Sequence, residues 1–572
     1  MVIDSGAKGC GRLTRSDRDE RANREAGTGR QEGGGRGRRK VFLPEGFSVI
    51  CPPVPASQRK SASSSVTELA MPTAMAVFLT CFSCLLWLAS AAPIGPPDLY
   101  RCKPRSPCCL PSPTSPPTPF SRNTSTPVRT RRALQNVLQD TTYLTALRTA
   151  YDRLRELSRS SPDDPRGFFQ QSNLHCAFCL TSDLSYGNEF NMHGNWYFLP
   201  WHRMLLYYHE RILGWAAGVP DLALPFWNWD NEAGRGFPAP YDDSGSSLHA
   251  EARRAAPERQ REIERSVTRE MMRTDVVLTD HWHPAMGNER EGGTLETGGH
   301  NWIHLAVGRE SDRREMGDLQ YAANDPIFYT HHANVDRLWE VWLGRDLRPG
   351  RGDRRNPSSA DFLDSRFTFF DENAMAKVIA VSDVLQLTNL RYSYERVSHD
   401  WIQPEDRTPA PQWAPLMGGS GEAPLQQSVK FRAVAHGTGN PNLVIADIKS
   451  PYPKSAPASV QSAGVVPMLR FFNIRHHLDK TLELHIFVNE PKANADTPRS
   501  GNPKYVQGHA FLPEGTLHKF CLSVSIGPAL ERLNLTLISN FTVQVVRGME
   551  FEVLPGRLSI EFIDYIISPS GM

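Results

Sequence analysis

Six histidines of this 572-residue chain are arranged in two sets of three that could bind metal ions. The first set is His175, His193 and His202, and the second set is His300, His304 and His332. Neutral imidazole suits copper, zinc, iron and nickel, and three imidazoles leave a coordination position open for chemistry. The pattern therefore predicts two metal ions that share one small-molecule site.

The spacing within the second set is informative. His300 and His304 are four residues apart, so on a helix they project from one face and can bind one ion together. His331 competes with His332 for the third place, but on a helix the two side chains point about 100° apart, so only one of them should face the metal. We choose His332, because Asp336 one turn later could orient its imidazole as a hydrogen-bonded carboxylate.

Other histidines have a simpler interpretation. His209 follows His202 by seven residues, which is a rise of roughly 10 Å on a helix and too far to reach the same ion. We expect a core role for His209. His281 and His283 are next to Pro284 in a predicted loop and have no third partner.

The remaining sequence predicts two kinds of domain. Apolar residues recur at helical spacing through much of 131–395, which predicts a mainly α domain that carries the histidines. Residues 396–465 are rich in proline and glycine and predict a linker. Residues 466–572 alternate in strand fashion, for example at 481–488, and predict a β-rich C-terminal sandwich or barrel.

The N-terminal region predicts export rather than a folded domain. Residues 1–70 bury little apolar surface and suggest either disorder or an over-extended gene model. Residues 71–91 predict a cleaved signal peptide, since the apolar run is too short to span a bilayer comfortably. Residues 92–130 predict a proline- and serine-rich arm pinned by cysteines. We expect the secretory pathway (apoplast or vacuole), or the thylakoid lumen of the plastid if 1–70 is real.

The net charge and the glycosylation sequons indicate which partners and which compartment to expect. The formal charge of +2 is close to neutral and basic residues are scattered among acids, which argues against nucleic-acid binding. No stable membrane span is expected after signal cleavage. Three glycosylation sequons agree with export; they begin at Asn123, Asn534 and Asn540.

Four motifs, in this order along the chain, resemble those of the plant polyphenol oxidases, the tyrosinase and catechol oxidase family of type-3 copper enzymes. They are NLHCAFC at 173–179, FLPWHR at 198–203, LPFWNWD at 224–230, and DPIFYTHH at 325–332 continuing to 339. The resemblance extends from residue 97 to about 565, and the tail resembles the family's C-terminal shielding domain. It implies a four-helix dicopper core.

The resemblance also implies roles for individual residues. His175, His193 and His202 would hold copper A, and His300, His304 and His332 would hold copper B. A thioether would join Cys179 to His193. Two disulfides would join Cys102 to Cys109 and Cys108 to Cys176. Leu319 occupies the position of the gate over copper B, while Glu296 and Asn301 match positions that hold and polarise a water, a possible general base for phenols.

The implied function is the oxidation of o-diphenols to o-quinones with O₂, together with ortho-hydroxylation of monophenols. The partners would be small phenols and O₂; neither the natural phenol nor the oligomeric state follows from the sequence. An oxygen carrier with the same two copper ions and no turnover is the main alternative. A zinc hydrolase would normally show a motif such as His-Glu-x-x-His, which is absent, and a metal-free structural protein fits poorly with six ligands.

Overall fold

The computed structural model describes the central and C-terminal parts of the chain. The described residues are 108, 110–122, 125–179, 192–277, 287–288, 291–308, 315–344, 355–404, 429–438, 440–451, 465–476, 481–512, 518–548 and 558–569. The predicted disordered segment (1–70) and signal peptide (71–91), as well as Cys102, Cys109, His281 and His283, lie outside these residues. Among the described residues, no helix is long and apolar enough to cross a membrane.

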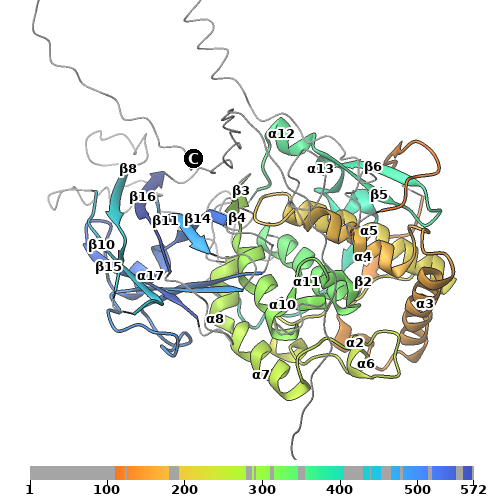
Figure 1. Ribbon diagram of the computed structural model, residues 1–572, viewed down its shortest axis with the longest axis horizontal. Helices are drawn as coiled ribbons and strands as arrows, with labels where there is room; N and C mark the ends of the chain where they lie inside the picture. The colour runs from red at the N-terminus through yellow and green to blue at the C-terminus, as the bar shows by residue number, and fades with distance from the viewer. Residues whose placement is uncertain are drawn as a thin grey trace, which may run out of the picture. The chain divides into compact units, whose positions relative to one another are not determined.

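The region before residue 404 is mainly helical (Figure 1). Its α-helices are α2 (Leu134–Val137), α3 (Thr141–Ser160), α4 (Phe168–Cys179), α5 (Phe198–Ala217), α6 (Ala239–Asp242), α7 (Ala256–Ser266), α8 (Arg269–Met272), α10 (Asn301–Val307), α11 (Ile327–Trp342), α12 (Ala360–Leu363), α13 (Val381–Val384) and α14 (Leu387–Leu390). Shorter helical turns are η1 (Glu232–Gly234), η2 (Arg273–Val277), η3 (Glu296–His300), η4 (Glu315–Gly317) and η5 (Ala322–Asn324).

Helices α5 and α11 form the centre of this helical domain. Nearly every side chain of both helices is buried, which is expected of a helix surrounded by other elements rather than lying on the surface. The surface helix α3 is amphipathic and packs on α5. Asp140 begins α3 by accepting a hydrogen bond from Tyr143 N at 3.0 Å, and this cap lies between α2 and α3.

Short strands join the two ends of the helical domain. β2 (Arg129–Arg131) pairs in parallel with β7 (Tyr392–Tyr394). β1 (Thr118–Pro119) pairs in parallel with β6 (Ala376–Ala380), which also pairs antiparallel with β5 (Arg366–Phe370). The described part of the predicted arm is therefore paired with the last segment of the helical domain.

The helical domain also contains a disulfide and a short β-hairpin. A disulfide joins Cys108 to Cys176 on α4. The side chain of Cys179 lies outside the described part of the chain, so the implied thioether does too. A two-stranded hairpin is formed by β3 (Gly287–Asn288) and β4 (Glu291–Gly292).

The C-terminal region, called the tail here (429–569), consists of two sheets. One has the order β13-β12-β15-β10-β9 and the other β14-β11-β16-β8, and apolar residues of both sheets form one core cluster. The strands are β8 (Val429–Val434), β9 (His436–Gly437), β10 (Leu443–Ile448), β11 (Val465–His476), β12 (Leu482–Val488), β13 (Tyr505–Phe511), β14 (His518–Ser525), β15 (Phe541–Arg547) and β16 (Phe562–Pro569), with one helix, α17 (Gly527–Arg532). The prediction of a mainly α domain followed by a β-rich domain is confirmed.

The structure differs from the predicted linker at 396–465. β8 pairs with β16, and β10 pairs with β15 along six residues, so both strands belong to the tail sheets. The prolines and glycines that suggested a linker flank these strands rather than interrupt them. Between the strand segments, 405–428 and 452–464 are outside the described residues.

Candidate metal centre

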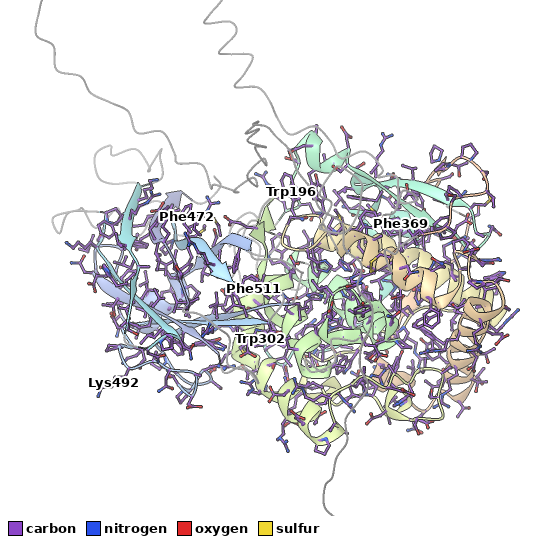
Figure 2. All side chains as sticks on the ribbon, viewed as in Figure 1. Trp196, Trp302, Phe369, Phe472, Lys492 and Phe511 are labelled. Atoms are coloured by element: carbon purple, nitrogen blue, oxygen red, sulfur yellow. A yellow bond between two sulfur atoms is a disulfide. The ribbon has the colours of Figure 1, made fainter. Side chains whose placement is uncertain are left out.

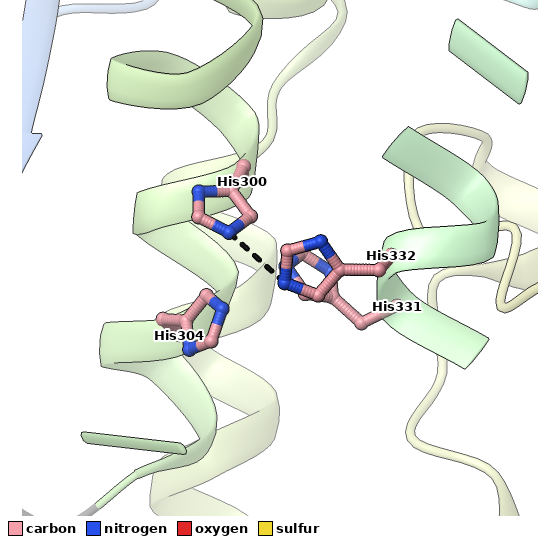
Figure 3. A group of neighbouring side chains, drawn as sticks. All are labelled: His300, His304, His331 and His332. Atoms are coloured by element: carbon pink, nitrogen blue, oxygen red, sulfur yellow. Dashed lines mark hydrogen bonds between the residues drawn. The ribbon is translucent and has the colours of Figure 1, made fainter. Parts of the chain in front are cut away.

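The two predicted histidine sets are each gathered in the structure. His175 comes from α4, His193 from the segment before α5, and His202 from α5; each offers a ligand atom within 4.8 Å of the others. The members of the second group come from three elements. His300 is the last residue of η3, His304 lies on α10, and His331 and His332 lie on α11 (Figure 3). All seven side chains are buried.

The two groups lie side by side and form one centre. The rings of His202 and His332 stack with centroids 4.2 Å apart and planes 7° apart. Phe198 packs on His300 at 4.6 Å, and Phe328 packs on His175 at 4.6 Å, both edge-on. The sequence motifs contain these two phenylalanines, but only the structure shows that they form apolar walls of the centre.

Backbone carbonyls orient the imidazoles. The Nδ1 atom of His202 donates to Phe198 O at 2.8 Å, and that of His304 donates to Met316 O at 2.8 Å. A ring that donates from Nδ1 presents the lone pair of Nε2. Within the described part of the chain, the Nε2 atoms of His202 and His304 are buried and have no hydrogen-bond partner. Such orphaned nitrogens fit a metal-binding group.

Burial keeps these imidazoles neutral. It lowers the pKa of His202 from 6.5 to about 3 and that of His304 to about 4, in each case chiefly because the charged form loses its water. The pKa of His175 and of His332 is also well below 6.5, again mainly through burial and then through neighbouring histidines. Neutral imidazole is the form that binds metals, so the centre is ready for ligation near neutral pH.

The structure does not separate His331 from His332 as the helical-wheel argument predicted. Both residues offer a ligand atom to the second group, and the ring of His331 stacks on His300 at 5.1 Å with an interplanar angle of 15°. Although the two side chains leave the helix in different directions, both reach the group from different sides. His331 lies next to Trp229, whereas His332 lies against His202. His332 Nε2 lies 3.3 Å from His300 Nε2, so His332 is the residue that faces both groups.

Asp336 does not orient His332, contrary to the sequence-based expectation. Its Oδ1 accepts from Arg203 Nε at 2.5 Å, and its Oδ2 accepts from the hydroxyls of Tyr392 and Tyr394 at 2.6 and 2.5 Å. Arg131 also contacts Oδ2, at 3.4 Å. Both carboxylate oxygens are thus used by a buried network that joins α11 to α5, β2 and β7.

His209 lies outside both histidine groups, in the core role expected of it. Its Nε2 lies 3.1 Å from Tyr151 Oη, and its ring stacks on Tyr329 with centroids 3.5 Å apart.

The two residues expected to hold a water are close to the centre but contact other groups. Glu296 Oε1 accepts from Gly194 N at 2.8 Å, next to His193. Asn301 Nδ2 donates to Ala510 O of the tail at 2.6 Å. In the full chain the amide of Asn301 is therefore bonded to the tail.

The tail also covers the predicted gate. Leu319 is buried and packs with Leu512 of the tail and with Leu305. His509 of the tail places Nδ1 2.9 Å from Thr297 Oγ1. The sequence did not single out residues 509–512, because nothing in their composition separates them from any other strand end; the resemblance pointed only to the tail as a whole.

Comparison with known proteins agrees with this centre. The model of the common central domain of tyrosinase matches residues 165–260 and 240–345, and that of the polyphenol oxidase middle domain matches 356–406. The chain is 37% identical over 357 residues to the latent form of polyphenol oxidase, chloroplastic, of Prunus armeniaca, covering 55% of this chain and 58% of that protein. The match thus spans less than two thirds of that relative.

Two further similarities extend over the tail. The chloroplastic polyphenol oxidase of Vitis vinifera is 28% identical over 520 residues, covering 83% of each chain. Among solved structures, latent apple tyrosinase matches with a TM-score of 0.64 and 26% identity, covering 79% of this chain and 100% of that one.

The expectation of the secretory pathway is wrong. The curated relatives from Prunus armeniaca, Solanum lycopersicum, Vitis vinifera and Solanum tuberosum are all named as chloroplastic. A secretory signal and the apolar half of a two-part plastid signal have the same short apolar run and small-residue cleavage site, so the pattern at 71–91 could not separate them.

Proposed function

We propose that this chain, which belongs to the plant polyphenol oxidases of the tyrosinase family, oxidises o-diphenols to o-quinones with O₂. Two diphenol molecules lose four electrons and four protons to one O₂, which yields two quinones and two waters. The observation that carries the proposal is the pair of adjacent, buried histidine groups, in which the Nε2 atoms of His202 and His304 have no hydrogen-bond partner within the described part of the chain.

The proposed cofactor is a pair of copper ions. His175, His193 and His202 would hold one ion, and His300, His304 and His332 would hold the other. Imidazole suits copper, and neither histidine group includes a carboxylate. When bound, the copper pair supplies the exchange of electrons between the diphenol and O₂.

The chain's own residues prepare the site for this exchange. The backbone carbonyls of Phe198 and Met316 fix two ring orientations, so no reorganisation of these ligands is needed. The rings of Phe198 and Phe328 exclude water from the walls of the centre.

We further propose that the tail keeps the full chain latent. The carbonyl oxygen of Ala510 accepts a hydrogen bond from the side-chain amide of Asn301, and Leu512 packs on the gate residue Leu319. A phenol cannot approach Leu319 from this side while Leu512 is docked. Cleavage within 405–428, between the helical domain and β8, would release the tail.

Hydroxylation of monophenols is proposed for the tail-released form. A phenol binds metal productively as phenolate, yet its pKa in water is about 10, so a base must accept its proton near neutral pH. Glu296 is buried beside His193. When the tail is released, the side-chain amide of Asn301 no longer donates to Ala510 O and can bind another group. These two side chains would then hold the water that accepts the proton.

Copper analysis and oxygen uptake, before and after limited proteolysis, test the proposal. We expect two coppers per chain in both forms, slow uptake with catechol in the full chain, and faster uptake after cleavage. The absence of copper, or copper binding without catechol oxidation in the cleaved form, would contradict the enzyme and favour an oxygen carrier. For the compartment we propose the plastid, and fusion of residues 1–92 to a fluorescent protein tests it by imaging.

A further inference from the structure

A cavity of about 270 Å³ lies where the helical domain meets the tail, apart from the histidine centre. From the helical domain it is lined by α8 and the first residues of η2. From the tail it is lined by the loop before β13, by β13 itself and by Arg532 at the end of α17. None of the residues of the two histidine groups lines it.

Three arginines from three different segments line this cavity: Arg273, Arg499 and Arg532. Neither Arg499 nor Arg532 forms an ion pair within the described part of the chain; Arg532 donates instead to the backbone carbonyl of Tyr505 at 2.6 Å. Burial lowers the pKa of both arginines, and nearby glutamates oppose this effect only in part.

The two carboxylates that line the cavity are already used. Glu270 Oε2 accepts from Gly501 N at 2.8 Å. Asp275 accepts from Gln507 Nε2 at 2.8 Å and from Gly299 N at 3.2 Å. Burial raises the pKa of Asp275 to about 7, which reduces its negative charge further. The cavity therefore retains an excess of positive charge.

Two buried arginines of the helical domain are paired with carboxylates. Arg253 pairs with Asp325, and Arg203 pairs with Asp336, both in bidentate or networked contacts. At the cavity, half-buried Arg499 and exposed Arg532 form no such pair within the described part of the chain. An excess of guanidinium groups that faces a cavity is what a site for a ligand carboxylate requires, because planar guanidinium matches carboxylate geometry.

Apolar side chains also line the cavity. Met271, Val506 and Tyr505 are buried and line the cavity, together with Pro503. A volume of about 270 Å³ accommodates one aromatic ring with a short side chain, and is at the small end of ligand pockets. We propose that this cavity binds a small aromatic carboxylate, with the ring against Met271 and Val506 and the carboxylate on the arginines.

Such a ligand would also stabilise the docked tail. Its site is complete only when the tail contacts the helical domain, so it binds the docked form better and shifts the population toward that form. This consequence, unlike the binding itself, rests on the latency proposed above. The ligand should slow catechol oxidation by the full chain and leave the cleaved enzyme unaffected.

Titration calorimetry of the full chain tests the binding directly, without reference to turnover. The probes are cinnamate, its uncharged amide, and inorganic phosphate, which has charge but no ring. We expect cinnamate to bind, and both other probes to bind at least about tenfold more weakly, since each lacks one of the two recognised features.

Substitutions locate the site. Arg499→Gln should weaken cinnamate binding by about tenfold, because a charge-assisted hydrogen bond is lost. Arg499→Lys should bind more tightly than Arg499→Gln but less tightly than the wild type, because the charge remains and the planar group is lost. Lys492→Gln, on the exposed tip of the tail (Figure 2), should change nothing. Cinnamate binding that is unchanged in Arg499→Gln, or is lost in His332→Ala, would place the ligand at the histidine centre and overturn the proposal. Equal binding of the amide or of phosphate, or no binding of cinnamate, would also overturn it.

Discussion

At the scale of the residue, the direction in which each imidazole is held decides what the centre can bind. A histidine that donates from Nδ1 to a carbonyl can ligate only through Nε2, and His202 and His304 are held in this way. The contrast with His209 is instructive. Its Nε2 is hydrogen-bonded to Tyr151, so the same residue type on the same helix has a structural role.

We predict that His332→Ala reduces the copper content from two ions per chain toward one. The ring of His332 is the group that stacks on His202 and lies 3.3 Å from His300 Nε2. Metal analysis by mass spectrometry measures this. His209→Ala is the matched control and should keep two coppers. Loss of copper in His331→Ala together with full copper in His332→Ala would show that His331 is the ligand.

We predict that Glu296→Gln and Asn301→Gly, in the cleaved enzyme, selectively impair monophenol hydroxylation. General-base catalysis is worth on the order of 10²-fold or more, so the ratio of monophenol to diphenol rate should fall by about that factor. Rates with a monophenol and its matching diphenol measure the ratio. A parallel fall of both rates would assign these residues a structural role, and a cleaved wild type without monophenol activity would remove the premise.

At the scale of the element, α11 is held by a buried network of charges rather than by apolar packing alone. Asp336 receives two guanidinium groups and two phenol hydroxyls from α5, β2 and β7. Since His332 lies one turn before Asp336, this network fixes the position of the helix that carries the ligand. Its effect on the metal is indirect.

Asp336→Asn should therefore destabilise the protein strongly. Removal of one partner leaves buried guanidinium charge uncompensated, which costs about 3–5 kcal/mol. Denaturant unfolding of the full chain measures the difference. The control is Glu156→Gln, which breaks an exposed i,i+3 pair with Arg159 and should cost less than about 1 kcal/mol. A loss for Asp336→Asn as small as that of the control would refute the importance of the network.

The helices that carry His175, His202 and His332 were predictable from the sequence, because each is marked by a long motif around its histidine. The role of Asp336 was not, since its partners are distant in sequence and a carboxylate four residues after a histidine on a helix suggested a local contact. β8 and β10 were also missed. Six-residue strands flanked by proline and glycine resemble a linker until their pairing with β16 and β15 is seen.

At the scale of the whole molecule, the proposed latency depends on the contact between tail and helical domain. We predict that Leu512→Asp raises catechol turnover by the full chain by about tenfold or more, because a carboxylate buried against Leu319 opposes docking. Oxygen uptake measures it. Val434→Asp, at an exposed position of the same tail, is the control and should have no effect. Equal turnover in the full chain, the variant and the cleaved enzyme would exclude latency.

We also predict that acid weakens docking of the tail. His485 of β12 stacks on Trp302 of α10, and its Nε2 lies 3.7 Å from Glu483 Oε2. Burial, followed by the opposing effect of Glu483, leaves the pKa of His485 lowered from 6.5 to about 4, with the charges of Arg499 and Arg265 also nearby. A released tail binds this proton more readily, so docking is full above pH 6.5 and is lost progressively as pH falls toward 4.

The rate of protease cleavage between the domains, measured from pH 7 to pH 4, tests this pH dependence. His485→Phe keeps a ring against Trp302 and should flatten the increase in cleavage at low pH. His436→Phe changes an exposed histidine of the same tail and should not. An increase that is identical in all three proteins would assign the effect to other groups.

The parallel pairing of β2 with β7 brings the two ends of the helical domain together. Arg129 and Tyr392 are register partners, so β2 and β7, near the two ends of the domain, are hydrogen-bonded neighbours although 263 positions separate these two residues. A domain whose ends meet can be joined end to end by a short peptide and reopened in a surface loop. Circular permutants of 125–404 are therefore accessible, and so is insertion of this unit into a loop of an unrelated host protein.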